Sequence, residues 1–573
     1  MRSVWRVAKD EAVAERGMVA AKHPLAVEAG LAALKRGGNA VDAAVTTAFT
    51  LGVVEPGASG LGGGGMMIVH QAATGRNVVV DFAMDAPLAA TADSYELERG
   101  AGSSRFGWRK VKDDANVSGY RAVAVPGLVR GLALALERFG TVSLSEALGP
   151  AIRFAEEGFV PAWTTSLQIA VSMPILSRFP ASAAVFLPGG FPPRPIDGNS
   201  SGARLVQPDL ARTLRAIARE GPDAFYRGAI ARTIGEAMRQ HGGLVSEEDL
   251  ATYRATLVDG GLTTDYRGHQ VVGVPGACGA MTALQSLNIL EGFDLARSGA
   301  GTPESVHRQA EAFRRAFADR YRYVGDPKQA AVPWSGLLSK AYARALRDRI
   351  DPERAAAVVE PGDPWAFESG RLASEAPVAG VFGASGDRST THVCAVDGER
   401  NVVSLTQTLV NLFGSGVIVP GTGVLLNNAM LWFDPEHGRP NSLEPGKRGL
   451  NNMTPLLLLR DGRPLLAVGA PGGLRIVNAM AQVVVNVVDY RMGIQDAIAA
   501  PRIDCSGRDL LVDARFPDSV PRALEAMGHR LRVVEESFYG ANFSTPLGIL
   551  IHPETGRLHG GVDPFRPAIA AGY

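Results

Sequence analysis

A small polar loop turns directly into an apolar strand in Gly386-Asp387-Arg388-Ser389-Thr390-Thr391-His392-Val393-Cys394-Ala395-Val396-Asp397. If the peptide bond before Thr390 were broken, Thr390 would carry both a hydroxyl nucleophile and a free α-amine. That amine can act as the base for its own hydroxyl, the threonine form of an activated nucleophile. Threonine also begins many ordinary strands. The surrounding sequence must therefore decide whether Thr390 is catalytic.

A glycine-rich segment lies well before this strand, at Gly60-Leu61-Gly62-Gly63-Gly64-Gly65. It matches the G-x-G-x-x-G pattern of dinucleotide sites, and Asp81 follows about twenty residues later, as such a site requires. The next residues, however, predict a strand, a turn at Thr74-Gly75 and a second strand, whereas a pyrophosphate site needs a helix to begin there. We therefore expect these glycines to let backbone approach backbone near Thr390.

The remaining pattern predicts a layered α+β protein. After Thr390 the chain alternates like strands, and both halves combine strands with helices, which fits an αββα sandwich with two sheets face to face. In Ala312 to Arg320 the aromatics fall at helical spacing, which indicates core packing, and we expect the charges on the other face of this stretch to be solvated. Strands are predicted at Met18 to Ala21, Thr391 to Val396, Val402 to Leu409, Leu456 to Leu459 and Leu465 to Gly469, with helices at Leu128 to Phe139, Leu144 to Glu157, Pro303 to Tyr323 and Ile476 to Tyr490.

Composition narrows the function classes. The 573 residues carry 58 Lys+Arg and 58 Asp+Glu, so nothing favours nucleic acid or an acidic membrane as a partner. A small molecule is therefore expected as the substrate in place of a nucleic acid or a membrane surface. Cys278, Cys394 and Cys505 are too far apart in sequence to form a metal or redox motif. The first ten residues lack the apolar run of a signal peptide, and no stretch resembles a membrane span, so we expect a cytoplasmic protein.

Taken together, the motifs resemble those of the gamma-glutamyltransferase family, self-processing members of the N-terminal nucleophile hydrolases. The resemblance runs almost end to end. It implies a four-layer αββα sandwich formed by residues 1–573 as a single unit. The motifs that carry it are Gly38-Asn39-Ala40-Val41-Asp42-Ala43-Ala44, Ser59 to Gly65, Thr390-Thr391-His392, Phe413-Gly414-Ser415-Gly416, Leu426-Asn427-Asn428, Pro445-Gly446-Lys447-Arg448, Pro471-Gly472-Gly473-Leu474-Arg475-Ile476 and Ala571-Gly572-Tyr573.

The resemblance assigns roles to several residues. Thr390 is expected to cut the chain before itself, giving a large subunit, 1–389, and a small subunit, 390–573, from one precursor. Thr408 matches the threonine that hydrogen-bonds the nucleophile. Gly472 and Gly473 match the backbone donors of the oxyanion hole. His392 is expected to be a structural hydrogen-bonding residue, and neither a cofactor nor a metal is implied.

The chain departs from the family in the substrate pocket. The arginine that holds a γ-glutamyl carboxylate falls on Ala92, and a serine pair falls on Asn451-Asn452. The side chains that hold its α-amine fall on Val410, Ala429 and Trp432. Asn411 stands one position after the expected asparagine and would face the wrong way in an extended strand. These changes predict a more apolar acyl site with poor affinity for a γ-glutamyl group.

The leading interpretation is a self-processed hydrolase or acyltransferase in which Thr390 cleaves an amide-linked acyl group other than γ-glutamyl. Phe433-Asp434-Pro435 with Gly438-Arg439-Pro440 looks closer to the acylase-type branch. Three alternatives stay open. They are a true gamma-glutamyltransferase or glutathione hydrolase, a carbon–carbon bond hydrolase of natural-product biosynthesis, and an uncleaved, non-catalytic scaffold.

Overall fold

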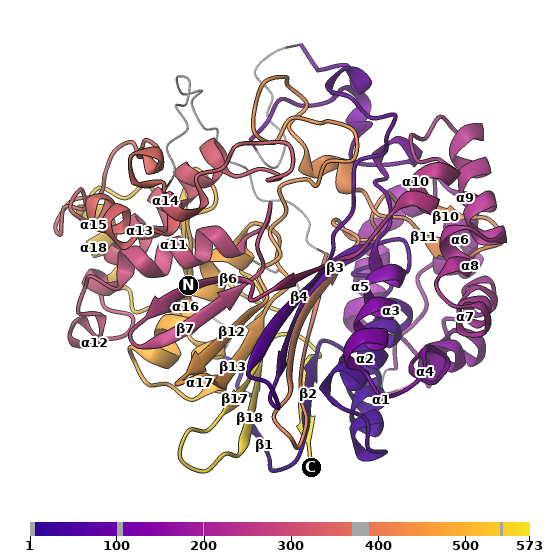
Figure 1. Cartoon of the computed structure of the whole chain (residues 1–573), viewed down its shortest axis with the longest axis horizontal. Coiled ribbons are helices and arrows are strands. Elements are labelled where there is room, and N and C mark those ends of the chain that lie inside the picture. The colour runs from indigo at the N-terminus through magenta and orange to yellow at the C-terminus, as the bar shows by residue number, and fades with distance from the viewer. Residues whose placement is uncertain (1–5, 100–106, 197, 199, 370–388, 539–541) are drawn as a thin grey trace.

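A computed structural model describes residues 6–99, 107–196, 198, 200–369, 389–538 and 542–573. Residues 386–388 of the loop before Thr390 lie outside these ranges. Two large sheets stand side by side in the centre of Figure 1, with helices α1 to α10 on one side and most of α11 to α18 on the other. The predicted α+β sandwich with four αββα layers is confirmed.

The first sheet carries Thr390 at the beginning of one strand. Within the described residues it has seven strands, and every neighbouring pair is antiparallel. In spatial order they are β19 (Ile569–Gly572), β2 (Met18–Ala21), β8 (Thr391–Val396), β9 (Val402–Thr408), β3 (Gly64–Gln71), β4 (Arg76–Phe82) and β5 (Thr256–Asp259).

The second sheet faces the first. It also has seven described strands in an antiparallel arrangement. Their order is β1 (Ala12–Ala14), β18 (Leu558–Val562), β17 (Leu547–Ile551), β13 (Arg463–Gly469), β12 (Leu456–Arg460), β7 (His269–Gly273) and β6 (Leu262–Tyr266).

Helices cover the outer face of each sheet. On the first sheet's side they are α1 (Pro24–Lys35), α2 (Ala40–Val54), α3 (Leu128–Phe139), α4 (Leu144–Glu157), α5 (Trp163–Leu176), α6 (Pro180–Phe186), α7 (Pro208–Glu220), α8 (Asp223–Tyr226), α9 (Ala229–Gln240) and α10 (Glu247–Thr252). On the other side they are α11 (Ala280–Leu290), α12 (Leu295–Ser298), α13 (Pro303–Tyr323), α14 (Trp334–Leu338), α15 (Lys340–Arg347), α16 (Arg475–Val488), α17 (Ile494–Ala499) and α18 (Ser519–Ala526).

Small elements complete the described chain. Two short strands pair as β10 (Ile418–Val419) and β11 (Val424–Leu425), and a three-stranded sheet contains β14 (Ile503–Asp504), β15 (Leu510–Asp513) and β16 (Leu531–Val534). The 3₁₀ helices are η1 (Ala92–Ser94), η2 (Lys112–Asp114), η3 (Tyr120–Ala122), η4 (Pro188–Gly190), η5 (Pro364–Phe367) and η6 (Ala429–Trp432).

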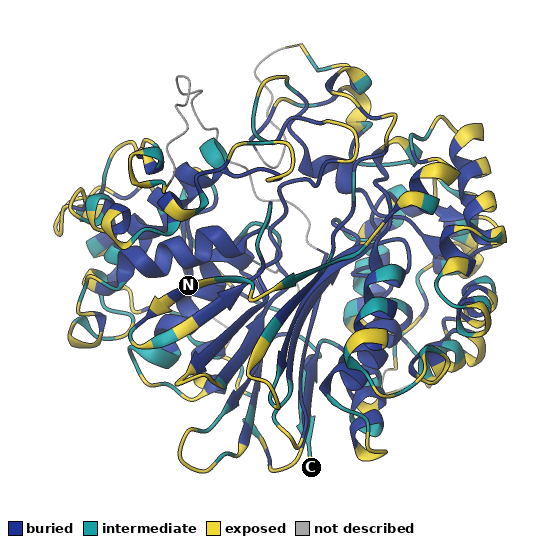
Figure 2. Ribbon diagram, in the orientation of Figure 1, coloured by how far each residue is buried: buried dark blue, intermediate teal, exposed yellow. Residues whose placement is uncertain are grey.

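Strand alternation explains the layers. Along β8, Val393 and Ala395 pack into the core under α1 and α2, whereas Cys394 and Val396 pack into the core between the two sheets. Both faces of the central strands are therefore buried, as the dark ribbons in Figure 2 show. A side chain on the inner face of β8, such as His392, is enclosed by both sheets.

Most predicted elements are confirmed, with small shifts at their ends. The helices at 128–139, 144–157 and 303–323 and the strands at 18–21 and 391–396 have the predicted bounds. One prediction about α13 is wrong. Its charged residues Arg315, Asp319 and Arg320 are buried, because α11, α15, α18 and the loop around Gly362 enclose the helix.

The glycine-rich segment forms the beginning of β3, and the predicted strand–turn–strand follows it. An added Cβ at Gly63 would lie 2.4 Å from the carbonyl oxygen of Thr408, and one at Gly65 would lie 2.5 Å from that of Thr406. No ordinary side chain fits at these distances. The prediction that glycine allows close backbone approach near Thr390 is confirmed at β9, the strand beside Thr390.

Asp42 joins α2 to the segment after α3. Its carboxylate caps its own helix by accepting from the backbone N–H of Asn39 at 2.7 Å, and it accepts three further hydrogen bonds, from the N–H and hydroxyl of Thr141 and the N–H of Val142. The side chain is fully buried. A single carboxylate therefore satisfies four donors in the helical layer behind β8 and β9.

Replacing this carboxylate should destabilise the protein. Asp42→Ala removes a buried carboxylate and leaves its four donors without this partner, so we expect the free energy of unfolding to fall by about 2–4 kcal/mol. Urea denaturation followed by tryptophan fluorescence measures the change. Glu28→Ala, at an exposed position on the neighbouring α1, is the matched control and should leave the midpoint unchanged. An equal effect of both substitutions would contradict the role of Asp42.

Candidate active site

Thr390 lies at the junction of loop and strand, immediately before β8, and is buried. Thr408 ends the neighbouring strand β9 and reaches the same point, because Thr391 pairs with Gln407 in the antiparallel register. The two hydroxyl oxygens are 3.1 Å apart. The hydroxyl of Thr408 also lies 3.1 Å from the carbonyl oxygen of Ser389, and the hydroxyl of Thr390 contacts that same carbonyl.

One assignment of protons prepares the Ser389 carbonyl for attack. The backbone N–H of Val410 donates to the hydroxyl oxygen of Thr408 at 2.8 Å. Each hydroxyl has a single proton. If Thr408 donates its proton to the Ser389 carbonyl, the Thr390 hydroxyl can donate to Thr408. The carbonyl of Ser389 is then polarised, and a lone pair of Thr390 faces it.

His392 lies two residues further along β8, on the face between the sheets. Its Nδ1 is 2.8 Å from the hydroxyl of Thr406, and its Nε2 is 3.3 Å from the sulfur of Cys394. Burial lowers its pKa to about 3, so the ring is neutral at physiological pH. These contacts agree with the structural role expected for His392.

Lys22 also borders Thr390 and is paired with Glu55, and sequence reasoning missed both residues. The ammonium of Lys22 donates to the carbonyl oxygen of Thr390 at 3.2 Å and forms an ion pair with Glu55. Glu55 is buried, and its Oε2 has no hydrogen-bond partner within the described residues. Lys22 follows β2, and the pairing of β2 with β8 brings it to Thr390, whereas Glu55 caps the C-terminal end of α2 and reaches the site through its ion pair with Lys22. No local motif marks either residue.

Gly472 and Gly473 follow β13, in the opposite sheet. An added Cβ at Gly469, the last residue of β13, would lie 2.1 Å from the ring of His392. Three further residues span at most about 10 Å, so the glycine pair lies at the end of the sandwich where β8 begins. Both glycines have positive φ, 147° and 63°. An added Cβ at Gly472 would lie 2.7 Å from Cα of Ser544.

The segment after Thr408 is a tight loop, not an extended strand. Val410 has φ 86°, which costs a β-branched residue about 1–3 kcal/mol. Phe413 and Gly414 also have positive φ. The alternation of faces expected for Asn411 therefore does not apply. Asn411 is half-buried, and its backbone N–H donates to the side chain of Asn428 at 3.0 Å.

The residues predicted to form an apolar acyl site partly come together. Val410, Ala429 and Trp432 belong to one buried cluster, the last two on η6. The indole N–H of Trp432 has no hydrogen-bond partner among the described residues; the contact made by this residue is its backbone oxygen with Asn441. Ala92 is buried at the beginning of η1. The guanidinium of Arg121 donates a hydrogen bond to the carbonyl oxygen of Ser94, the last residue of η1.

Asn451 and Asn452 lie in the loop before β12, where Arg320 holds them. The buried guanidinium of Arg320 donates to the backbone oxygen of Asn451 at 2.6 Å and to the side-chain oxygen of Asn452 at 3.0 Å. The side-chain amide of Asn451 donates to the carbonyl oxygen of Ala277, and its oxygen accepts from the backbone N–H of Met453. The Nδ2 amide of Asn452, in contrast, has no partner in the part of the chain that is described. Arg320 was missed because its helix face was expected to be solvated.

Two negative observations apply to the described residues alone. They contain no group of three or more His, Cys, Asp or Glu side chains placed to hold a metal ion. Their helices also include none that is both long enough and apolar enough to cross a membrane.

The sequence profile of the family described as Gamma-glutamyltranspeptidase matches residues 26–573. The chain belongs to this family. Among its gamma-glutamyltranspeptidase relatives, the Acylase ACY 1 proenzyme of Pseudomonas sp. (strain SE83) is 43% identical over 525 residues, covering 91% of this chain and 88% of the relative. The Glutathione hydrolase proenzyme of Escherichia coli (strain K12) is 35% identical over 581 residues, covering 98% and 92%.

A solved structure shares the fold of this gamma-glutamyltranspeptidase family member along its whole length. The cephalosporin acylase from Bacillus halodurans superimposes with a TM-score of 0.86 at 31% sequence identity, covering 100% of this chain and 98% of that one. The family resemblance expected from the motifs is confirmed, and acylases and glutathione hydrolases both occur among the relatives.

The position of Lys22 generates a pH prediction. A cation beside Thr390 disfavours protonation of an α-amine formed there, so Lys22→Met should move the acid limb of the kcat/KM profile to higher pH by about one unit. Lys22→Arg keeps the charge and should keep the profile. Initial rates between pH 5 and 9 measure the limb. Identical profiles for the Met and Arg variants would contradict an electrostatic role for Lys22.

Proposed function

We propose that this chain is a self-processing amidohydrolase that uses Thr390 as its N-terminal nucleophile and cleaves an amide-linked acyl group other than γ-glutamyl. One observation carries the proposal. The hydroxyl of Thr390 contacts the carbonyl of the residue before it, and Thr408 contacts both groups. A strand-starting threonine without a catalytic role has no need of this arrangement. Membership of the gamma-glutamyltranspeptidase family supports it.

In the processing step, Oγ of Thr390 attacks the carbonyl carbon of Ser389. A bond forms between this oxygen and the carbon, the peptide C–N bond breaks, and the nitrogen takes the proton that the hydroxyl loses. Water then hydrolyses the resulting ester. The products are a carboxylate on Ser389 and a free amine and hydroxyl on Thr390, which separate residues 1–389 from residues 390–573.

In turnover, the new amine removes the proton from the Thr390 hydroxyl, since an α-amine has a reference pKa of about 7.7–8.0. The oxygen attacks the substrate amide, and the negative charge that develops is stabilised by the N–H groups of Gly472 and Gly473. One such donor contributes about 2.7–4 kcal/mol to lowering the barrier. The leaving amine takes a proton, and water hydrolyses the acyl-enzyme.

The acyl site is proposed to bind its ligand with apolar surface and neutral donors. Val410, Ala429 and Trp432 supply buried apolar surface where a γ-glutamyl site would hold an α-amine. The unpaired N–H groups of Trp432 and Asn452 can donate to an acyl carbonyl or to a distal carboxylate. A zwitterionic γ-glutamyl group would lose its charged partners here, at about 1.5–3 kcal/mol for each hydrogen bond to a charged group.

A glutathione hydrolase is the second candidate. The Glutathione hydrolase proenzyme of Escherichia coli aligns with 98% of this chain, more than the acylase does. The guanidinium of Arg121, near Ala92, is the described cation that a γ-glutamyl carboxylate could use in this reading. Substrate preference separates the two candidates.

Processing is tested on the purified protein. Two fragments are expected, and N-terminal sequencing of the smaller one should begin Thr390-Thr391-His392. Thr390→Ala should abolish cleavage and turnover, while Thr390→Ser retains part of both.

Thr408→Val should slow cleavage about tenfold or more, because it removes the donor to the Ser389 carbonyl, and Thr408→Ser should restore the cleavage rate. A fully active, uncleaved chain would rule the proposal out.

Specificity is tested with acyl-p-nitroanilides. For the unmodified enzyme, kcat/KM for glutaryl or an uncharged acyl group should exceed that for γ-glutamyl by about tenfold or more. Ala92→Arg combined with Trp432→Asp should raise γ-glutamyl activity, and Arg121→Gln should leave the unmodified preference in place. Preference for γ-glutamyl that disappears in Arg121→Gln would establish the second candidate instead.

A further inference from the structure

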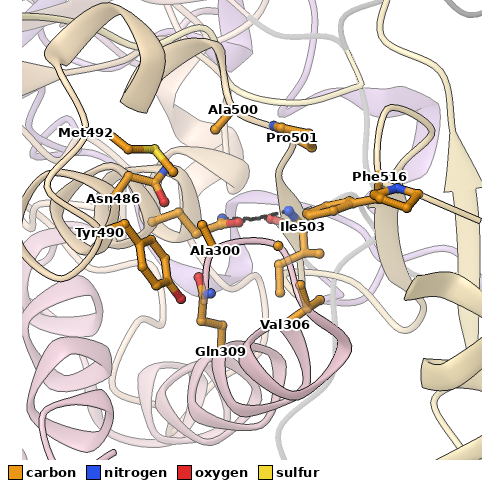
Figure 3. Close-up of a pocket in the computed structure, with 13 residues that line it drawn as sticks. Ala300, Val306, Gln309, Asn486, Tyr490, Met492, Ala500, Pro501, Ile503 and Phe516 are labelled. Atoms are coloured by element: carbon orange, nitrogen blue, oxygen red, sulfur yellow. Dashed lines mark hydrogen bonds between the residues drawn. The ribbon is translucent and has the colours of Figure 1, made fainter. Parts of the chain in front are cut away.

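A cavity of about 280 Å³ opens in the helical layer outside the second sheet. Its lining comes from α13, α16, β14 and the loops beside them, and includes no residue of the sheet that carries Thr390. Figure 3 shows Asn486 and Tyr490 on one side, Phe516 on the other, and Val306 and Gln309 rising from the helix below. The cavity is therefore separate from the candidate active site.

The lining has a consistent chemistry. Val306, Ile503, Met492 and Phe516 supply apolar surface, and no lining residue is charged. The cavity therefore disfavours a charged ligand, which would be desolvated without a partner. Its volume fits a molecule of about ten non-hydrogen atoms. Aromatic and aliphatic surface with a few polar groups is the usual composition of a small-molecule site.

Two side-chain oxygens in the lining have no hydrogen-bond partner among the described residues, Oε1 of Gln309, whose Nε2 donates to Ser305, and Oδ1 of Asn486. Asn486 is buried, and its Nδ2 donates to the carbonyl oxygen of Ala497 at 3.0 Å. That bond fixes the orientation of the amide, because a carbonyl can only accept. Its Oδ1 is left as an acceptor without a partner among the described residues. By contrast, both amide atoms of Gln482 are used by Ile503, the contact drawn dashed in Figure 3.

We propose that this cavity binds a small, uncharged aromatic molecule that carries one N–H or O–H donor. The ring packs between Phe516 and the aliphatic side chains, and the donor bonds to Oδ1 of Asn486. The site is additional to the acyl site and does not depend on the proposed function.

The two helices that line the cavity also lead to the candidate active site. Further along α13, Arg320 holds Asn451 and Asn452. At its other end α16 begins at Arg475, one residue beyond the pair Gly472 and Gly473. A bound molecule that fixes α13 against α16 affects the position of the Asn451-Asn452 loop and of the Gly472-Gly473 pair. Occupancy of the cavity should therefore change kcat/KM. This coupling, unlike the binding itself, rests on the proposed function.

Three probes of similar size test the binding. Indole carries the donor, benzothiophene has the same shape without it, and indole-3-carboxylate adds a charge. By saturation-transfer NMR and calorimetry, indole should bind with a Kd of about 1 mM or tighter. Benzothiophene should bind at least fivefold more weakly, and indole-3-carboxylate should not bind. Failure of indole to bind the unmodified protein would overturn the proposal.

Variants locate the site. Ala500→Phe and, independently, Ala300→Phe place a ring in the cavity and should each weaken indole binding at least tenfold. Ala526→Phe, at an exposed alanine on α18 outside the lining, is the matched control and should bind as the unmodified protein does. Near-UV circular dichroism checks that each variant is folded. Unchanged binding in both folded cavity variants would overturn the proposal.

The coupling has its own readout. With saturating indole, kcat/KM of the unmodified enzyme should change at least twofold, and Ala500→Phe should abolish the response. Bound indole with an unchanged rate would overturn the coupling. Because binding is measured without turnover, an inactive enzyme that still binds indole would count against the proposed function and not against the site.

Discussion

The contact of Thr408 with both sides of the Ser389–Thr390 bond is the constraint on which the candidate site depends. It requires β9 to end beside the residue at which β8 begins, and the antiparallel register provides that. It also requires β3 to lie against β9 with no side chain between their backbones near Thr408. Gly63 and Gly65 meet this requirement, since an added Cβ at either would overlap a carbonyl of β9. A glycine segment that resembles a nucleotide motif thus serves to bring strands together.

The sequence predicted what depends on short-range patterns. Strand β8, the helices α3, α4 and α13, and the strand–turn–strand after the glycines follow from alternation, helical spacing and turn residues. The α13 charges could not be predicted in this way. Asp319 looks like one member of a solvated face, yet it accepts from Tyr342, Gln285 and Gly362, which come from three other segments. A buried charge is identified by its partners, and those are fixed only by tertiary packing.

The same limit applies at the site. Thr390 and Thr408 were found because their motifs match a family. Lys22 lies almost as close to Thr390 and is paired with Glu55, but these two residues follow β2 and α2, more than three hundred residues earlier in the chain. Asn411 shows the opposite failure. A rule for extended strands was applied to a loop in which Val410 has positive φ, so its direction could not be deduced from alternation.

The uncharged residues of the proposed acyl site and the buried guanidinium of Arg320 follow the same electrostatic principle: a buried charge needs partners. The residues of the proposed acyl site, Ala92, Val410, Ala429 and Trp432, are all uncharged and buried. The buried guanidinium of Arg320 is turned toward the protein, because its Nη1 and Nη2 donate to Cys278, Asn451 and Asn452, while its Nε has no partner among the described residues. Burial disfavours its charged form and lowers its pKa, so its carbonyl partners compensate it only in part. Its charge therefore serves to fix the loop of Asn451 and Asn452.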